Sequence, residues 1–180
     1  LRSDQISYQF YEGDRKLPDP FARSFDIRKS YGKLKNESDV KSLIPTDAFD
    51  WEGDKNPRLR YSESIGYCMH VRGFTAHVSS GVADRGTFRG IIDKIPYLKE
   101  TGITTIELQP CYEFLELEPE TSPVPHYYLQ SQEQEPKLNY WGYKKGYYYA
   151  PKSSYAAGED AVTEFKELVK ALHRNGMELV

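Results

Sequence analysis

The most evident chemical groups in this chain are four closely spaced glutamates, Glu113, Glu116, Glu118 and Glu120. Neighbouring carboxylates can serve as an acid and a base on one substrate, or bind calcium through their oxygens. This run, however, lies in a polar stretch with prolines at 119 and 123, and the chain contains no Asp-x-Asp-x-Asp-Gly calcium loop. We therefore expect solvated surface charges here rather than a catalytic pair or a metal site.

Two more polar residues fall within apolar runs. His70 lies in 65–71 (IGYCMHV), where a lone histidine is typical of a hydrogen-bonded core residue, although a role in chemistry stays open. Glu107 alternates with Ile106 and Leu108, which predicts a buried carboxylate that needs a partner. Arg72 is a candidate for that partner, in a structural ion pair.

Aromatic residues are concentrated between residues 109 and 158. Aromatic side chains make up 14% of the chain, which has 15 tyrosines, and this stretch holds eleven of the aromatic residues. They are Tyr112, Phe114, Tyr127, Tyr128, Tyr140, Trp141, Tyr143, Tyr147, Tyr148, Tyr149 and Tyr155. A tyrosine offers an apolar ring for packing and a hydroxyl for hydrogen bonding, which suits a sugar. The stretch therefore predicts an aromatic wall around a carbohydrate site.

The elements that would position this wall alternate between strand and helix. Short apolar runs at 65–71, 103–108 and 177–180 predict buried strands. A helix is expected from Thr87 to Gly102 with a kink at Pro96, and a second from Asp160 to Gly176. On that second helix, Val162, Phe165, Val169 and Leu172 would form the apolar side, with Leu168 supporting it. This order indicates a parallel sheet, either doubly wound or a (β/α)8 barrel.

The connection at 109–158 is far longer than an ordinary strand-to-helix loop. Loops at the carboxyl ends of barrel strands build active sites, so its length indicates function. Residues 1–60 are irregular, with one strand expected at 6–11, and they do not close a core alone. The predicted organisation is therefore a linker, or the end of a β-sandwich module, at 1–60, followed at 61–180 by the opening part of a parallel α/β domain.

Several segments, in order, resemble the debranching branch of the α-amylase superfamily, which includes pullulanases, isoamylases and glycogen debranching enzymes. The resemblance is carried by 138–143 (LNYWGY), 149–151 (YAP), 49–54 (FDWEGD), 67–75 (YCMHVRGFT), 106–114 (IELQPCYEF) and 173–180 (HRNGMELV). The segment at 19–22 (DPFA) is similar to the exit from the family's N-terminal β-sandwich. One departure is Lys144, where pullulanases commonly have Asp, and this weakens the assignment to that subtype.

This resemblance implies the first part of a (β/α)8 TIM barrel, about strands 1 to 3, in a retaining glycosidase that hydrolyses α-1,6 branch points of pullulan, glycogen or starch. Within it, Tyr143 would stack on the sugar at the cleavage point, while Trp141 and Asn139 would support the loop. For Trp141 a buried anchor is the expected role. The family's catalytic carboxylates would follow Val180, so no catalytic residue is expected in this chain, and the chain alone would be inactive.

Charge and composition argue against nucleic acid and membranes as partners, which leaves the α-glucan that the resemblance implies. The net charge of −3 gives no attraction to nucleic acid, and no run of about 18 apolar residues predicts a membrane span. No cofactor or metal ligand set is identifiable, while calcium elsewhere in the parent enzyme is compatible with the resemblance. Two cysteines mildly favour a cytoplasmic setting, but the sequence does not decide the compartment.

Three interpretations remain open: an enzyme segment, a non-catalytic glucan-binding module, and a small α/β interaction domain. The chain starts without Met and ends in an apolar stretch, and we expect both ends to be cuts in a longer protein. Three parallel strands leave two open edges, so we expect self-association through them if the chain folds alone.

Overall fold

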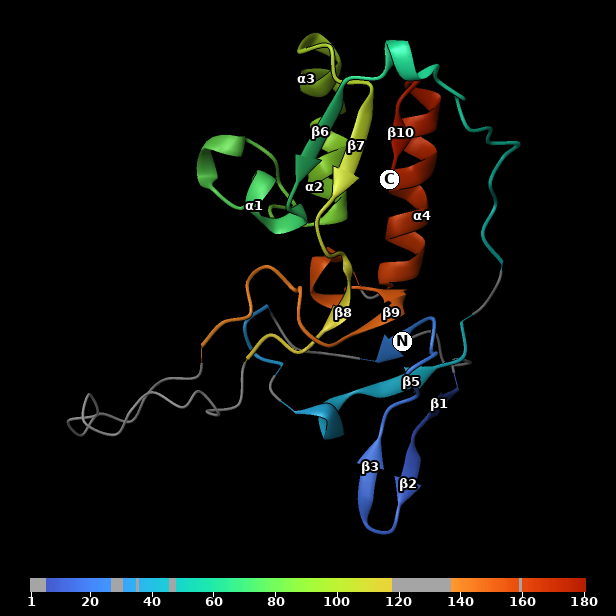
Figure 1. Ribbon diagram of the computed structural model, residues 1–180, viewed down its shortest axis with the longest axis vertical. Coiled ribbons are helices and arrows are strands. Elements are labelled where there is room, and N and C mark those ends of the chain that lie inside the picture. Colours follow the sequence, from blue (N-terminus) through green and yellow to red (C-terminus); the bar gives the residue numbers. More distant parts are fainter. Residues whose placement is uncertain (1–5, 27–30, 35, 46–47, 118–136, 159) are drawn as a thin grey trace, which may run out of the picture.

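The computed structural model describes residues 6–26, 31–34, 36–45, 48–117, 137–158 and 160–180 (Figure 1). The N-terminal part contains β1 (Ser7–Tyr8), β2 (Phe10–Glu12), β3 (Arg15–Leu17), β4 (Phe25–Asp26), η1 (Glu37–Asp39) and β5 (Lys41–Leu43). The part that follows contains η2 (Tyr61–Glu63), β6 (Gly66–Met69), α1 (Val71–Thr75), η3 (Val78–Ser80), α2 (Phe88–Asp93), α3 (Ile95–Glu100), β7 (Thr105–Leu108), β8 (Tyr112–Phe114), β9 (Gly146–Pro151), η5 (Ser153–Tyr155), α4 (Ala161–Arg174) and β10 (Glu178–Leu179).

The centre of the fold is a parallel sheet in the order β10-β7-β6. Gly66 of β6 pairs with Thr105 of β7, and Glu178 of β10 pairs with the same residue from the other side. Helices α2 and α3 connect the first two strands, and α4 connects the second to the third (Figure 1). The predicted strands and their parallel arrangement are confirmed, because consecutive strands joined by helices lie side by side.

The predicted kinked helix is two short helices. The Thr87 side chain accepts a hydrogen bond from the Gly90 amide at 3.2 Å and begins α2. α2 ends at Asp93, with Lys94 as its C-cap, and Pro96 then occupies the first turn of α3. A proline lacks the amide that would continue the helical ladder, whereas the first turn requires no such donor. The break therefore falls just before the proline.

The buried face of helix α4 is shifted from the predicted one, although Phe165, Leu168 and Leu172 all pack on the core as expected. Its fully buried residues are Glu164, Leu168 and Leu172, whereas Val162 is half-buried. Leu168 therefore lies at the centre of the contact with the sheet rather than beside it. Together with residues of α2, α3 and the strands, the two leucines form the main core, which includes Met69, Val71, Phe88, Ile91, Ile95, Leu98, Ile106, Phe114, Tyr155 and Met177.

The expectation that β6 and Glu107 are buried is wrong. Only Met69 of β6 is buried, and Glu107 on β7 is exposed. The sheet packs one face on its helices, and in the described part of the chain nothing covers these residues on the other. Arg72, the proposed partner of Glu107, instead lies 4.4 Å above the ring of Tyr31.

The N-terminal residues form short antiparallel strands. The single strand expected at 6–11 is two strands, with β1 pairing with β5, and β2 with β3. A second core joins Phe25, Leu34 and Val40 to Tyr147 and Ala150 of β9. This segment thus builds its core with the long connection rather than alone. A domain boundary near residue 60, and association through the edges of the parallel sheet, stay predictions.

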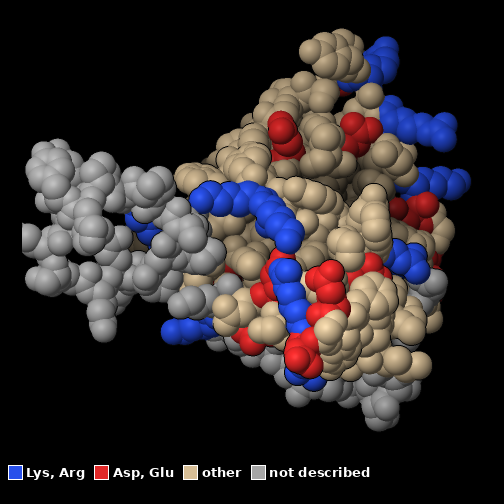
Figure 2. All heavy atoms as spheres, turned by 60° about the horizontal axis from the view of Figure 1, so that its bottom comes forward, with Lys and Arg blue, Asp and Glu red and all other residues tan. Residues whose placement is uncertain are grey.

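The surface charges are mixed. On the face that Figure 2 turns forward, acidic and basic side chains lie side by side, as on an ordinary solvated surface. Among the described helices, none has the combination of length and apolar character that crossing a lipid bilayer requires.

Removal of the N-cap of α4 tests whether Asp160 stabilises the start of this helix. The Asp160 carboxylate accepts the amides of Val162 and Thr163 at 3.1 and 3.3 Å. Asp160→Ala should lower the free energy of unfolding by about 1 kcal/mol, because these amides lose their acceptor. Asp160→Asn is the matched control, since asparagine caps about equally well. Urea unfolding of the three proteins measures the difference, and equal losses in both variants would contradict the capping role.

Candidate functional site

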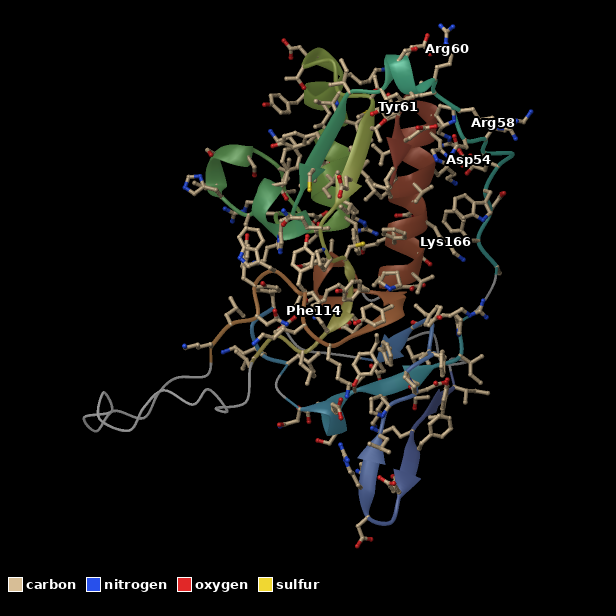
Figure 3. The ribbon with its side chains drawn as sticks, viewed as in Figure 1. Asp54, Arg58, Arg60, Tyr61, Phe114 and Lys166 are labelled. Atoms are coloured by element: carbon tan, nitrogen blue, oxygen red, sulfur yellow. The ribbon has the colours of Figure 1, made fainter. Side chains whose placement is uncertain are left out.

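The aromatic residues gather at the carboxyl ends of the parallel strands. β8 and β9 form an antiparallel ribbon beneath those ends, and the ribbon lies between the sheet and the N-terminal strands (Figure 1). The long connection is therefore not without regular structure. In Figure 3, Phe114 of β8 lies at this junction, whereas Tyr61 lies at the opposite end of the sheet. Tyr127 and Tyr128 fall outside the described residues.

His70 organises the site from the end of β6. Its Nδ1 accepts the Gly73 amide at 2.9 Å, so the ring proton is on Nε2, which lies 2.9 Å from the Tyr140 carbonyl oxygen and 3.1 Å from the Tyr155 hydroxyl. Tyr140 stacks on the imidazole at 4.4 Å between ring centroids. Burial lowers the pKa of His70, which keeps it neutral. The prediction of a hydrogen-bonded core histidine is confirmed.

Trp141 is not the buried anchor that we expected. It contacts His70 and Tyr140 edge-on, yet 54% of its surface is exposed. The reason is that Tyr140, and not Trp141, takes the inner position against the imidazole. Tyr143 is 71% exposed. The turn thus presents two aromatic side chains to solvent, while Tyr140 stacks on His70 on its inner side.

Asn139 holds that turn through two hydrogen bonds, while its predicted place at a sugar site stays a prediction. Its Oδ1 accepts the Gly142 amide at 3.2 Å and its Nδ2 donates to the Leu115 carbonyl at 3.1 Å. Gly142 has a φ of +74°, and a Cβ there would come within 2.5 Å of the Phe114 ring. Both the left-handed backbone and the close ring require glycine. Only this residue type therefore lets Tyr143 leave the turn in the observed direction.

Tyr112 and Tyr148 extend the aromatic surface along the ribbon. Their rings meet edge-on at 4.8 Å, and the Tyr112 hydroxyl donates to the Gly142 carbonyl at 2.9 Å. Burial, together with the neighbouring Tyr148 and Tyr143 hydroxyls, raises the pKa of Tyr112. The same turn is thus held from two sides, by the side chain of Asn139 within it and by Tyr112 of β8.

The expectation that the glutamate run is solvated is wrong for its first two members. Glu113 and Glu116 are fully buried and pair with the buried Lys152 ammonium at 2.6 and 2.8 Å. A buried carboxylate requires a counter-charge, and this lysine lies between β9 and η5, a partner that local sequence does not show. Glu118 and Glu120 lie outside the described residues.

Sequence reasoning also missed Tyr31. Its ring stacks on Tyr155 at 6.0 Å, lies under the Arg72 guanidinium, and its hydroxyl donates to the Tyr140 carbonyl at 3.4 Å. Burial raises the pKa of Tyr31 to about 12. Neither Tyr31, in an irregular stretch, nor Lys152, a single cation after a proline, carries a sequence signal that marks such a role.

The side chains of this site are suited to binding a ligand rather than to catalysis. Exposed rings with nearby hydroxyls can stack on and orient a sugar, while Glu113 and Glu116 are engaged by Lys152. Within the described residues, His, Cys, Asp and Glu side chains form no group of three that could hold a metal ion. An aromatic binding wall at the carboxyl ends of parallel barrel-type strands is the class of site that this geometry defines.

Comparisons with known proteins agree with this class. The model of the family described as "Alpha amylase, catalytic domain" matches residues 20–180. The chain belongs to this family. Isoamylase 1, chloroplastic, from Arabidopsis thaliana is 36% identical over 183 residues, covering 95% of this chain and 22% of that protein. A glycogen operon protein GlgX homolog from Haemophilus influenzae is 32% identical over 192 residues, covering 98% of this chain and 27% of that protein.

A solved structure shows the same fold. The pullulanase from Paenibacillus barengoltzii, in complex with maltohexaose and alpha-cyclodextrin, matches 96% of this chain and 27% of its own, with a TM-score of 0.67 and 24% identity. These relatives support a (β/α)8 barrel-type fold and the debranching branch of the family. The chain spans about a quarter of the length of the relatives it matches.

The neutral state of His70 predicts a pH dependence of stability. Because burial lowers its pKa in the folded state, the unfolded chain binds the proton more tightly. Stability should therefore fall as the pH drops below the unfolded-state pKa of about 6.5, by at most about 1.4 kcal/mol per pH unit from this group. Urea unfolding of wild type and His70→Gln across this range measures it. An equal slope in the variant would contradict the assignment to His70.

Proposed function

We propose that the whole protein is a retaining glycosidase that hydrolyses α-1,6-glucosidic branch points in pullulan, glycogen or starch. This chain supplies the first strands of its barrel and an aromatic wall of the substrate site. The observation that carries the proposal is the exposed Tyr143, which follows the exposed Trp141 by two residues on a hydrogen-bonded turn at the carboxyl ends of parallel strands. Membership of the α-amylase family supports an α-glucan as the substrate class for that wall.

The relatives support the choice of glucan and linkage. They include isoamylases and proteins of a glycogen operon, and the pullulanase structure holds maltohexaose. In such a site, the flat ring of Tyr143 would stack on the C–H face of a glucose unit. Asn139 and Trp141 would keep the ring in place and exclude water from one side of the sugar, which strengthens the electrostatic interactions there.

The reaction itself needs two carboxyl groups on one sugar. In a retaining enzyme, one attacks the anomeric carbon to form a glycosyl-enzyme while the other protonates the leaving oxygen and then activates water. We place both groups outside this chain, because Glu113 and Glu116 are held by the Lys152 ammonium. On this proposal the chain positions the substrate and leaves the bond cleavage to other strands.

The same observation favours a second candidate, a non-catalytic glucan-binding module. Such a module keeps exposed rings and needs no reactive carboxylate. Hydrolysis of pullulan or glycogen by the whole protein, measured as released reducing ends, decides between the two. Release of sugar supports the glycosidase, and glucan binding without release supports the module.

Truncation of Tyr143 tests its role in either candidate. Tyr143→Ala should weaken maltohexaose binding by about tenfold, because the stacking surface is lost. Tyr143→Phe keeps the ring and should bind almost as wild type does. Calorimetric titration measures both affinities. Tyr61→Ala is the control, since Tyr61 is 97% exposed and lies at the far end of the sheet (Figure 3). A loss of affinity in that variant equal to that of Tyr143→Ala would contradict a specific site at Tyr143.

A further inference from the structure

A buried ion cluster of Lys152, Glu113 and Glu116 lies behind the aromatic turn. The Lys152 ammonium donates to Glu113 Oε1 at 2.6 Å, contacts Glu116 Oε1 at 2.8 Å, and donates to the Phe114 carbonyl at 3.0 Å. The three charged side chains are 0 to 1% exposed. Every proton of the ammonium thus has an oxygen partner, which is what a buried cation requires.

The remaining carboxylate oxygens bind backbone amides from other segments. Glu113 Oε2 accepts the Ser153 amide at 2.7 Å. Glu116 Oε2 accepts the amides of residues 32 to 34 at 2.5 to 3.3 Å, and Ser154 Oγ donates to Glu116 Oε1. Although burial alone would raise the pKa of Glu116, the Lys152 ammonium and these donors hold it below its usual value. The cluster therefore joins three segments that are distant in sequence.

A short chain of hydrogen bonds connects the cluster to Tyr143. The backbone carbonyls of Leu115 and Glu116 accept the side-chain and main-chain N–H groups of Asn139, at 3.1 and 2.7 Å. Asn139 in turn accepts the Gly142 amide, and Gly142 immediately precedes Tyr143. On the other side, the amides bound by Glu116 follow Tyr31, whose hydroxyl donates to the Tyr140 carbonyl.

We propose that the cluster of Lys152, Glu113 and Glu116 is a positioning group that sets the place of Tyr143 against the bound sugar. The cluster fixes residues 113–116, which hold the turn through Asn139, and residues 31–34, which hold it through Tyr140. Hydrogen bonds to charged groups are directional, so they define a position where apolar packing alone would permit sliding. This role rests on the proposed function of the site.

A double-mutant cycle tests the role. Lys152→Met keeps the length of the side chain and removes the charge, and it should lower kcat/KM of the whole protein on pullulan about tenfold or more through misplacement of the ring. In a Tyr143→Ala background, the same change should cost less than about twofold, because the ring it positions is already absent. A purely structural lysine would give additive losses instead. Lys99→Met, at an exposed lysine of α3, is the control for charge removal.

Glu116→Gln is a second variant for the same double-mutant cycle, to be used if Lys152→Met does not fold. It preserves the shape and one acceptor oxygen, and its loss should likewise disappear in the Tyr143→Ala background. Additive losses, or unchanged kcat/KM in a folded Lys152 or Glu116 variant, would overturn the positioning role while leaving the glycosidase proposal intact. A wild-type protein that neither cleaves nor binds glucan would overturn the proposed function and this inference with it.

Discussion

The arrangement of the aromatic site depends on one buried ammonium between two carboxylates. Removal of three charges from water is costly, and the cost is offset only if every charge finds well-placed partners. Lys152 meets that condition with Glu113, Glu116 and the Phe114 carbonyl, and the two glutamates complete it with amides of two other segments. Any displacement of these segments would leave a buried charge without a partner. The ribbon, the N-terminal segment and the turn are therefore held in one geometry.

The aromatic site has a packed layer against the protein and an exposed layer that faces solvent. His70, Tyr140 and Tyr155 are packed and hydrogen-bonded, while Trp141 and Tyr143 face solvent. On the proposed function, this division suits the recognition of a polysaccharide. On the proposed function, a turn that is held in place before binding loses little conformational entropy when a sugar stacks on it, so more of the stacking energy contributes to affinity. Which of the neighbouring residues Tyr140 and Trp141 faces inward therefore decides which ring is open to a ligand.

The elements that local patterns determine were predictable. The apolar periods marked the parallel strands, Thr87 and Asp160 marked helix starts, and Pro96 marked a break. The prediction was less accurate where two patterns compete. The stripe on α4 could be centred on Phe165 or on Leu168, and only the packed sheet decided for Leu168. The exposure of Glu107 likewise depends on what covers the sheet and not on its own neighbours.

By itself, the sequence determined the strand–helix order, the helix caps, the family and the aromatic stretch, because each depends on residues a few positions apart or on an ordered set of motifs. Only the tertiary structure decided that Glu113 and Glu116 are buried, that Lys152 and Tyr31 belong to the site, and that Tyr140 rather than Trp141 lies inside. These contacts join segments up to about a hundred residues apart. The partner of a charge or a ring at such separation is set by chain topology, on which local composition carries no information.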